Sequence, residues 1–206
     1  SKNTVVLMKN AVDTDKFSYS TDVREKVRKK MKISRDTLVI GHVGRFTHDK
    51  NQSFLIDIFN QFHKKEKNSI LLLAGQGPLQ EEIKNKVREL GLDDSVGFLG
   101  QRNDANELYQ AFDVFLLPSL YEGLPVVGVE AQASGLLCFF SDDMTKETKV
   151  LDSTVFMSLS NTSEEWTGEI LTNLKDYKRI NTKNEVSDNG FDIEIEARKL
   201  EKYYIN

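Results

Sequence analysis

The sequence predicts an α/β fold, a Rossmann-like three-layer sandwich built on a six-stranded parallel sheet. Short apolar runs rich in β-forming residues recur along the chain and alternate with amphipathic segments at helical spacing. The runs are apolar almost throughout, as expected for parallel strands buried on both faces. Strands and helices that alternate at this pitch are joined by right-handed βαβ crossovers, which produce a parallel sheet.

The individual elements are expected in regular alternation. Strands are predicted near residues 37–43, 69–74, 95–99, 112–117, 136–140 and 154–158, and helices at 21–32, 51–67, 78–91, 104–111, 125–135 and 143–150. The second of these helices shows the spacing of one apolar stripe, formed by Ser53, Leu55, Ile56, Phe59 and Phe62. Gly91 suits the C-terminal end of the third helix.

Three further helical patterns close the chain, at 163–176, 180–188 and 192–204. The last helix is expected to pack through an inner stripe of Ile193, Ala197, Leu200 and Tyr204.

Length and composition limit the function classes. At 206 residues the chain has the length of one domain with a full core. The net charge of −4 gives no reason to expect nucleic acid, which favours a clustered basic excess. Cys138 is the one cysteine, so no intrachain disulfide is possible and a reducing cytoplasm is predicted. Its apolar surroundings predict a buried small side chain rather than a nucleophile. No apolar run approaches the roughly 20 residues of a membrane span.

The segment from Tyr121 to Glu130 places two carboxylates eight residues apart across a turn and a helix start. Glu122 falls in a turn that contains Gly123, and Pro125 suits the first position of a helix, where its missing N–H is not needed. The free N–H groups and positive dipole end of that helix, near Val126, can hold a phosphate. Carboxylates on both sides of a phosphate site could bind hydroxyls at the two ends of a nucleotide-sugar. The pattern therefore suggests a sugar-nucleotide transferase.

Other candidate residues follow the expected strands, at the ends where open parallel sheets bind their ligands. Gly44, Arg45 and Lys50 follow the first strand, and the two cations are spaced to reach one anionic group such as a diphosphate. Gly75 and Gly77 follow the second strand and allow a close backbone approach to a ligand. Solvated surface cations and a plain tight turn are the simpler explanations of the same residues.

Gln101 and Arg102 follow the third strand, where Arg102 either stacks on a base or is an ordinary surface arginine. The glycines near the first strand lack the third glycine of the dinucleotide-binding pattern, so a nicotinamide cofactor is not expected.

No metal site is expected, because the three histidines are scattered without metal-ligand spacing. His42 is interpreted as a strand residue near a phosphate loop, and His48 as a polar loop residue. Asp142 and Asp143 superficially suggest a metal carboxylate pair but are better explained as the N-cap region of a helix that begins near Thr145.

Five segments resemble, in the same order, the motifs of retaining group 1 (family 4) glycosyltransferases of the GT-B fold. They are Asn10-Ala-Val-Asp13 with Phe17, Gly44-Arg45 with Lys50, Gly75-Gln-Gly-Pro78, Phe98-Leu-Gly100, and the pair Glu122 and Glu130, which matches the E-x7-E signature. The glutamate pair alone would be weak evidence, whereas five segments in order over nearly the whole chain are specific.

The resemblance implies a role for each candidate residue. Glu122, Arg45 and Lys50 would be the catalytic residues, with the two cations neutralising the leaving nucleoside diphosphate. Glu130 would accept hydrogen bonds from the ribose hydroxyls. The rest of the donor site would be formed by Gly44, Gly75, Gly77, Gln101, Arg102, Gly123, Leu124, Pro125 and Val126. A nucleoside diphosphate-sugar, UDP-linked, would be the substrate, with no metal and no cofactor.

The resemblance also predicts how the chain is organised. Residues 1–18 would form the entry segment from another domain, 19–190 the nucleotide-sugar-binding domain, and 191–206 a C-terminal helix. An acceptor-binding N-terminal half would then be missing, and this chain alone would be inactive. The full enzyme would transfer a sugar to a glycan or lipid-linked acceptor in capsule or exopolysaccharide biosynthesis. Any contact with the inner membrane face would be made through the missing half.

Two alternatives stay open at this point. The chain could be a non-catalytic module that binds nucleotide-sugars, or it could belong to an enzyme of different GT-B chemistry, such as an epimerase or hydrolase. The sugar is also open, because Leu124 and Pro125 stand where many relatives have Phe-Gly.

Overall fold

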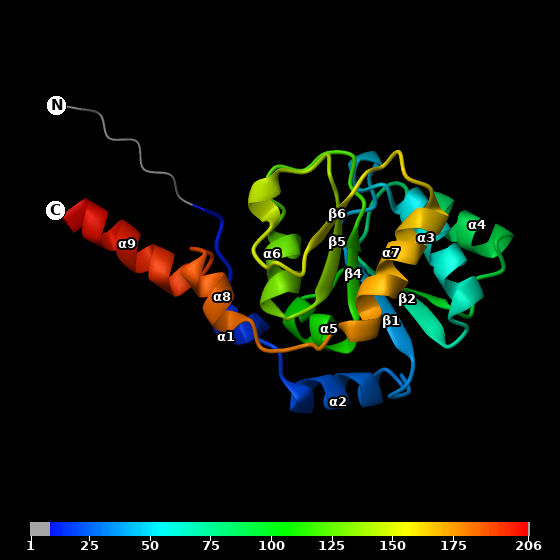
Figure 1. Ribbon diagram of the computed structural model, residues 1–206, viewed down its shortest axis with the longest axis horizontal. Helices are drawn as coiled ribbons and strands as arrows, with labels where there is room; N and C mark the ends of the chain where they lie inside the picture. Colours follow the sequence, from blue (N-terminus) through cyan, green and yellow to red (C-terminus); the bar gives the residue numbers. More distant parts are fainter. Residues whose placement is uncertain (1–8, 206) are drawn as a thin grey trace.

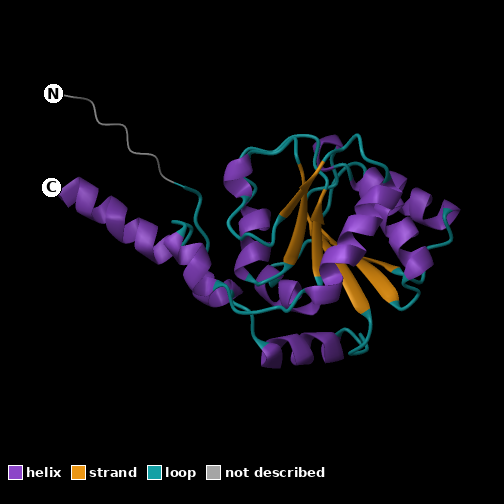
Figure 2. Ribbon diagram, viewed as in Figure 1, coloured by secondary structure: helices purple, strands orange, loops and turns teal. Residues whose placement is uncertain are grey.

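The computed structural model describes residues 9–205. Six parallel strands form a twisted central sheet with helices on both faces (Figure 1, Figure 2). The strands are β1 (Leu38–Val43), β2 (Ser69–Ala74), β3 (Val96–Gly100), β4 (Val114–Leu117), β5 (Leu137–Ser141) and β6 (Val155–Met157). The predicted fold class is confirmed, and every strand begins and ends within two residues of its expected position.

The strand order is β3-β2-β1-β4-β5-β6. From β1 the chain builds outward to β2 and β3, and then returns to the other side of β1 with β4. The ladder between β1 and β2 contains six residue pairs, whereas that between β1 and β4 contains two, Ile40 with Val114 and Gly41 with Phe115. At such a switch in strand order the loops after the two central strands leave in opposite directions, and the crevice between them is where open α/β sheets bind ligands.

The helices form one layer on each face of the sheet. One layer contains α3 (Gln52–Lys65), α4 (Gln80–Glu89) and α7 (Ser163–Asp176). The other contains α1 (Thr14–Phe17), α2 (Thr21–Lys30), α5 (Ala105–Ala111), α6 (Val126–Ala133) and α8 (Lys183–Asp188). Successive residues of a strand serve opposite layers, since Leu71 and Leu73 pack in the first core and Leu72 and Ala74 in the second. Burial on both faces explains why the strand sequences are apolar throughout.

The helix predicted at 143–150 is wrong. That segment contains a single 3₁₀ turn, η2 (Lys146–Thr148), capped by the side chain of Thr145 rather than by Asp142 or Asp143. The N–H groups of Val150 and Leu151 donate instead to Oε1 of Gln132, at 2.8 and 3.0 Å. A helix ladder here would require those N–H groups, so a side chain from α6 takes the place of local helix formation.

The last helix, α9 (Ile193–Ile205), is present, but its predicted packing is wrong. None of its described residues is buried, and Ile193 and Tyr204 are 45% and 78% exposed. The helix extends away from the α/β body (Figure 1). Its start is hydrogen-bonded to neighbouring segments, since Ile193 donates its N–H to Val12 and Val12 donates to Phe191, at 2.9 and 2.8 Å. The first eight residues of the predicted entry segment 1–18 lie outside the described residues.

Candidate functional site

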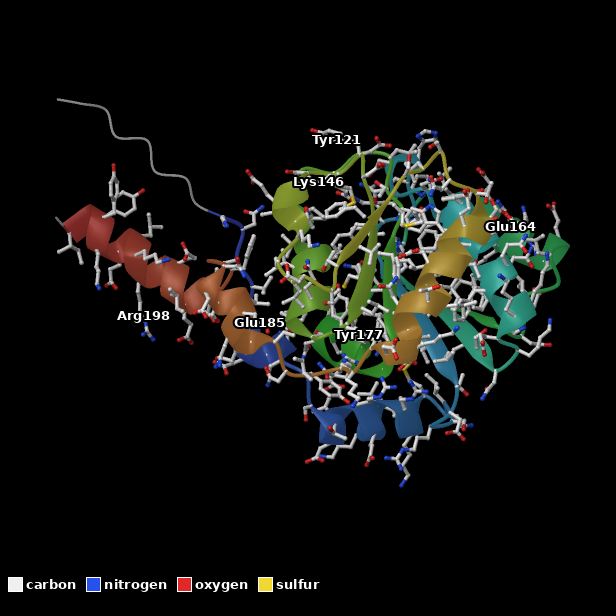
Figure 3. All side chains as sticks on the ribbon, in the orientation of Figure 1. Tyr121, Lys146, Glu164, Tyr177, Glu185 and Arg198 are labelled. Carbon is white, nitrogen blue, oxygen red and sulfur yellow. The ribbon has the colours of Figure 1, made fainter. Side chains whose placement is uncertain are left out.

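The predicted site residues follow the carboxyl ends of the strands and gather at one edge of the sheet, the carboxyl edge. Gly44, Arg45 and Lys50 follow β1, Gly75 and Gly77 follow β2, Gln101 and Arg102 follow β3, Glu122, Gly123, Leu124, Pro125 and Val126 link β4 to α6, and Glu130 lies within α6. Tyr121, which is labelled in Figure 3, marks this edge and is 73% exposed.

Two loops on either side of the β1–β4 crevice are tied together. Leu120 donates its backbone N–H to Asp49 at 2.8 Å, and Nδ2 of Asn51 donates to the Pro118 carbonyl at 3.1 Å. Asn51 adopts a left-handed conformation, with φ of 53°. Asparagine tolerates this region better than most residues, and here it turns the chain from η1 (His48–Lys50) into α3.

Lys50 and Glu122 meet across the crevice. The Lys50 ammonium donates to Oε1 of Glu122, and their side chains are 19% and 10% exposed. Ser119 donates its hydroxyl to the same Oε1 at 3.0 Å. Within the described residues Oε2 of Glu122 accepts no hydrogen bond. One oxygen of this carboxylate is therefore held in place while the other is free to accept from a ligand.

Glu130 has the same arrangement on α6. The Tyr109 hydroxyl donates to Oε2 of Glu130 at 2.9 Å, and no described residue donates to Oε1. Burial raises the pKa of Glu130, and this effect is opposed by the Tyr109 hydrogen bond and by Lys16. A partly desolvated carboxylate with one unused oxygen is suited to accept from ligand hydroxyls.

Arg45 presents an unused cation at the same edge. Its side chain is exposed and makes no hydrogen bond or ion pair with the described residues, while its backbone carbonyl accepts from Nε2 of Gln52 at 2.8 Å. Nearby, α6 begins at Val126 without a side-chain cap, because Pro125 occupies the cap position. Pro125 thus lies one residue ahead of its expected first helical position. The uncapped N–H groups leave the N-terminus of α6 able to bind an anion.

The glycines after β2 are explained by packing between loops. A Cβ at Gly75 would lie 1.9 Å from the Gly44 carbonyl oxygen, and one at Gly77 would lie 2.3 Å from that of Phe46. Gly75 also has φ of +137°, a conformation that favours glycine. Close approach of the β1 and β2 loops to each other therefore accounts for both glycines, and direct contact with a ligand stays a prediction.

The loop after β3 contains an ion pair of its own, and its contact with a ligand stays a prediction. Arg102 pairs with Asp104 through two hydrogen bonds of 2.7 and 2.5 Å, which engages the guanidinium that a base would stack on. Gln101 is exposed and makes no side-chain contact with the described residues.

Gln132 fixes the position of α6 and hence of Glu130. Its side chain is buried, its Nε2 donates to the Gly128 and Thr148 carbonyls, and its Oε1 accepts the three hydrogen bonds from Val150, Leu151 and Thr154. A helix held by a fully used amide keeps its site residues in a constant position.

Within residues 9–205 no three His, Cys, Asp or Glu side chains are grouped as metal ligands. Cys138 is buried, and burial raises the pKa of its thiol, as expected for a structural side chain.

An open groove of about 850 Å³, lined by Lys149, Tyr177 and their neighbours, contains none of the predicted site residues. None of the described helices has the length and apolar character needed to cross a membrane.

Several residues of the site were not predicted from the sequence. Tyr109 and Ser119 orient the two glutamates, and Asn51 and Gln52 hold the loop that carries Arg45 and Lys50. The sequence did contain a signal for Gln52. This polar residue stands three and four positions before Leu55 and Ile56, on the apolar side of α3, where it is buried. Tyr109 and Ser119 had no such signal, since tyrosine and serine are common on helices and in turns.

Comparison with known proteins agrees with this arrangement. The model of the family described as glycosyl transferases group 1 matches residues 23–191. EpsF of Bacillus subtilis, named as a glycosyltransferase, is 40% identical over 163 residues, which are 79% of this chain and 42% of EpsF. The Escherichia coli enzyme named UDP-Gal:alpha-D-GlcNAc-diphosphoundecaprenol alpha-1,3-galactosyltransferase is 30% identical over 141 residues, 67% of this chain and 36% of that protein. The chain thus spans about two fifths of the length of these relatives.

Solved structures of glycosyltransferases have the same fold. HepE of Anabaena in complex with UDP and glucose matches 98% of this chain and 56% of its own, with a TM-score of 0.80 and 21% identity. The C-terminal domain of LpcC, a group 1 family protein of Francisella tularensis, matches 88% of this chain and 95% of its own, with a TM-score of 0.69 and 21% identity.

Proposed function

Because this chain belongs to the group 1 glycosyltransferases and has the Rossmann-like fold of GT-B enzymes, we propose that it is the domain that binds the nucleoside diphosphate-sugar donor, with UDP as the nucleotide. The full-length protein would be a retaining glycosyltransferase of polysaccharide biosynthesis. The likeness to a separately solved C-terminal domain supports a position in the second half of the enzyme.

One observation carries this proposal: the two glutamates each have one tethered and one free oxygen at the same edge of the sheet. Glu130 would accept from the ribose hydroxyls, and Glu122 from the hydroxyls of the donor sugar. Between them in the sequence lies the uncapped start of α6. This arrangement fits a ligand with hydroxyl groups at both ends and phosphate groups in the middle.

The cations would stabilise the charge that develops on the leaving group. When the bond between the anomeric carbon and the phosphate oxygen breaks, the departing diphosphate gains negative charge, which Arg45, Lys50 and the N-terminus of α6 would stabilise. Lys50 can do this without leaving Glu122, because an ammonium has three donors and Glu122 uses one. The oxygen of the acceptor hydroxyl would then bond to the anomeric carbon and lose its proton to the departing diphosphate, with the acceptor held by the part of the enzyme that the longer relatives contain.

Calorimetry with UDP, GDP and ADP, with and without their sugars and in the presence of EDTA, tests donor binding and its metal independence. The chain should bind UDP most tightly and EDTA should not matter. Loss of binding in EDTA would contradict metal independence.

Two substitutions separate the roles of the glutamates. Glu130→Ala should weaken UDP and UDP-sugar binding alike, by about ten- to a hundredfold, because a charged hydrogen-bond partner of the ribose is lost. Glu122→Ala should spare UDP and weaken the UDP-sugar alone. Glu185→Ala is the control, since Figure 3 shows Glu185 on α8, well away from the carboxyl edge marked by Tyr121. Equal losses for UDP and UDP-sugar in Glu122→Ala would exclude the proposed division of roles.

The chain alone should transfer no sugar to an added acceptor, although slow hydrolysis of the donor is compatible with the proposal. Transfer requires the acceptor to be held in place beside the donor. Efficient glycosylation by this chain without a partner would show that the acceptor site is also present here.

A further inference from the structure

His42 lies at the floor of the crevice between β1 and β4. The β1–β4 ladder ends at Gly41 and Phe115, and His42 and Leu116 are the next residues of the two strands. The His42 ring is fully buried and stacks on the Phe115 ring, with centroids 6.4 Å apart and planes 9° apart. Its Nδ1 lies 2.9 Å from the Leu116 carbonyl oxygen. The His42 side chain thus connects β1 to β4 one residue beyond the last backbone pair of the two strands.

The hydrogen bonds determine which ring nitrogen carries the proton. A carbonyl oxygen only accepts, so Nδ1 of His42 must be the donor to Leu116. Burial lowers the pKa of His42 to about 4, an effect that the Leu116 contact opposes and the nearby Lys50 charge adds to. The ring is therefore neutral at physiological pH, and Nε2 has a free lone pair directed towards α3.

Gln52 uses that lone pair. Its Nε2 lies 3.3 Å from Nε2 of His42 and 2.8 Å from the Arg45 carbonyl oxygen, so both amide hydrogens are donated. The opposite amide orientation would place an oxygen against two acceptors. In the observed orientation Oε1 of Gln52 is buried without a partner among the described residues. An unsatisfied buried acceptor costs free energy. The observed orientation therefore requires that the two donated hydrogen bonds stabilise the structure by more than this cost.

The chain of contacts connects both sides of the crevice. It runs from the Leu116 carbonyl in β4 through His42 and Gln52 to the backbone of Arg45. A Cβ at Gly44 would lie 3.0 Å from Nε2 of His42, so the loop rests directly on the ring. Neither His42 nor Gln52 is exposed enough to touch a ligand, with 0% and 1% exposure.

We propose that His42 and Gln52 are a positioning pair that sets the place of the Arg45 and Lys50 loop relative to β4, and thereby the affinity of the site for the diphosphate group. This inference rests on the proposed function, because the diphosphate is the ligand of that loop. The pair acts through the Arg45 backbone and holds the guanidinium and ammonium at the distance that a bound nucleotide requires. Small displacements of such groups have large effects on binding and catalysis.

The test compares two histidines that each make hydrogen-bond contacts through both ring nitrogens, the buried His42 and the partly buried His63. His42→Phe and Gln52→Leu remove the hydrogen bonds and fill the same space with an apolar side chain of similar size. UDP affinity should fall about tenfold in each variant. Thermal stability should also fall in Gln52→Leu, because the Arg45 carbonyl and Nε2 of His42 lose their donor, and removal of the unsatisfied Oε1 offsets this only in part. The matched control is His63→Phe. His63 lies on α3, contacts Ser69 and Ser95 through its two ring nitrogens at 3.0 and 3.3 Å, and packs beside Phe59. This control should lose stability and keep its UDP affinity.

A double-mutant cycle separates positioning from a general structural role. In an Arg45→Ala background, Gln52→Leu should reduce UDP affinity by less than in the wild type, because the group that it positions is gone. Additive losses, or wild-type affinity in Gln52→Leu, would overturn the proposal even if His42→Phe does not fold. If the wild-type chain itself binds no UDP, the proposed function fails, which is a different result from a wild type that binds and a Gln52→Leu variant that binds equally well.

Discussion

At the amino edge of the sheet, three arginines surround the end of α5, whereas at the carboxyl edge Arg45 makes no hydrogen bond or ion pair with the described residues. Arg24, Arg28 and Arg179 donate to the carbonyls of Gln110, Ala111, Phe112 and their neighbours. The Asp113 carboxylate, which also accepts the N–H of Val39, pairs with the first two. These carbonyls are the unsatisfied C-terminal groups of a helix, where positive charge is stabilised.

The difference shows how one residue type serves two purposes. The three arginines at the amino edge donate to backbone carbonyls and so connect α2, α5 and the segment after α7. Arg45 at the carboxyl edge makes no side-chain hydrogen bond or ion pair with the described residues, and it follows a strand instead of lying at a helix end. The two edges therefore differ in whether the arginine donors are engaged within the described structure, and not in the charge itself.

Replacing Arg179 should change the free energy of unfolding more than any other substitution considered, and it tests whether the arginines of the amino edge are structural. Its guanidinium donates to the carbonyls of Tyr109, Gln110, Phe112 and Ser134 and lies 4.3 Å from the Tyr19 ring centroid. Arg179→Ala removes four hydrogen bonds and leaves the Ser134 carbonyl without a donor among the described residues, so urea denaturation should show a loss of about 3 kcal/mol or more in the free energy of unfolding. Arg35→Ala, at an exposed surface ion pair, is the control and should change stability by roughly 0.5 kcal/mol or less. A similar small change in Arg179→Ala would mean that the amino edge is not a structural unit.

Replacing Arg45 should show the opposite behaviour. Arg45→Ala should lower UDP affinity by about ten- to a hundredfold, since a charge-assisted contact to phosphate is lost. The same urea titration should show a wild-type free energy of unfolding, because the exposed side chain makes no hydrogen bond or ion pair with the described residues. If stability fell and affinity did not, Arg45 would resemble the arginines of the amino edge.

Glu130 should make the free energy of unfolding depend on pH. Its pKa is raised, chiefly by burial, so the folded state binds the proton more tightly than the unfolded state. The contribution of this group to stability is therefore present at low pH and is lost as the pH rises from the unfolded value through the folded one. Glu130→Gln removes that loss and should increase the free energy of unfolding at pH 7, with no gain at pH 4. Equal stability of variant and wild type across this range would show that the carboxylate is placed there at no energetic cost.

Gly123 should give the smallest effect. A Cβ at this position meets no atom within 4 Å, so Gly123→Ala should fold with nearly wild-type stability. Gly75→Ala is the contrasting variant at the same edge, because its Cβ would strike the Gly44 carbonyl at a strained φ, and thermal denaturation should reveal a loss of about 2 kcal/mol. A large loss of stability in Gly123→Ala would show that the turn is more constrained than its open surroundings indicate.

Much of this protein was determined by local sequence. Apolar runs longer than a turn and helical stripes such as that of α3 are short-range patterns, and burial on both faces of the sheet requires them, so the six strands and the α/β class were predictable. The edge that carries the site was predictable too, since the carboxyl ends of parallel strands must meet. The order of motifs around Arg45, Lys50, Glu122 and Glu130 was sufficient to indicate a glycosyltransferase.

Only the tertiary structure decided which polar groups satisfy one another. Gln132 draws its bonds from residues 16 to 22 positions away and prevents a helix at 143–150, and Arg179 caps α5 from about 70 positions away. Helical periodicity predicted an inner stripe on α9, but no surface of the described chain lies against it. Propensity and periodicity act over a few residues, whereas a hydrogen-bond partner or a packing surface is supplied by whichever segment the fold brings near. For that reason the sequence motifs singled out Arg45, whereas the carbonyl partners of Arg179 could be identified only in the tertiary structure.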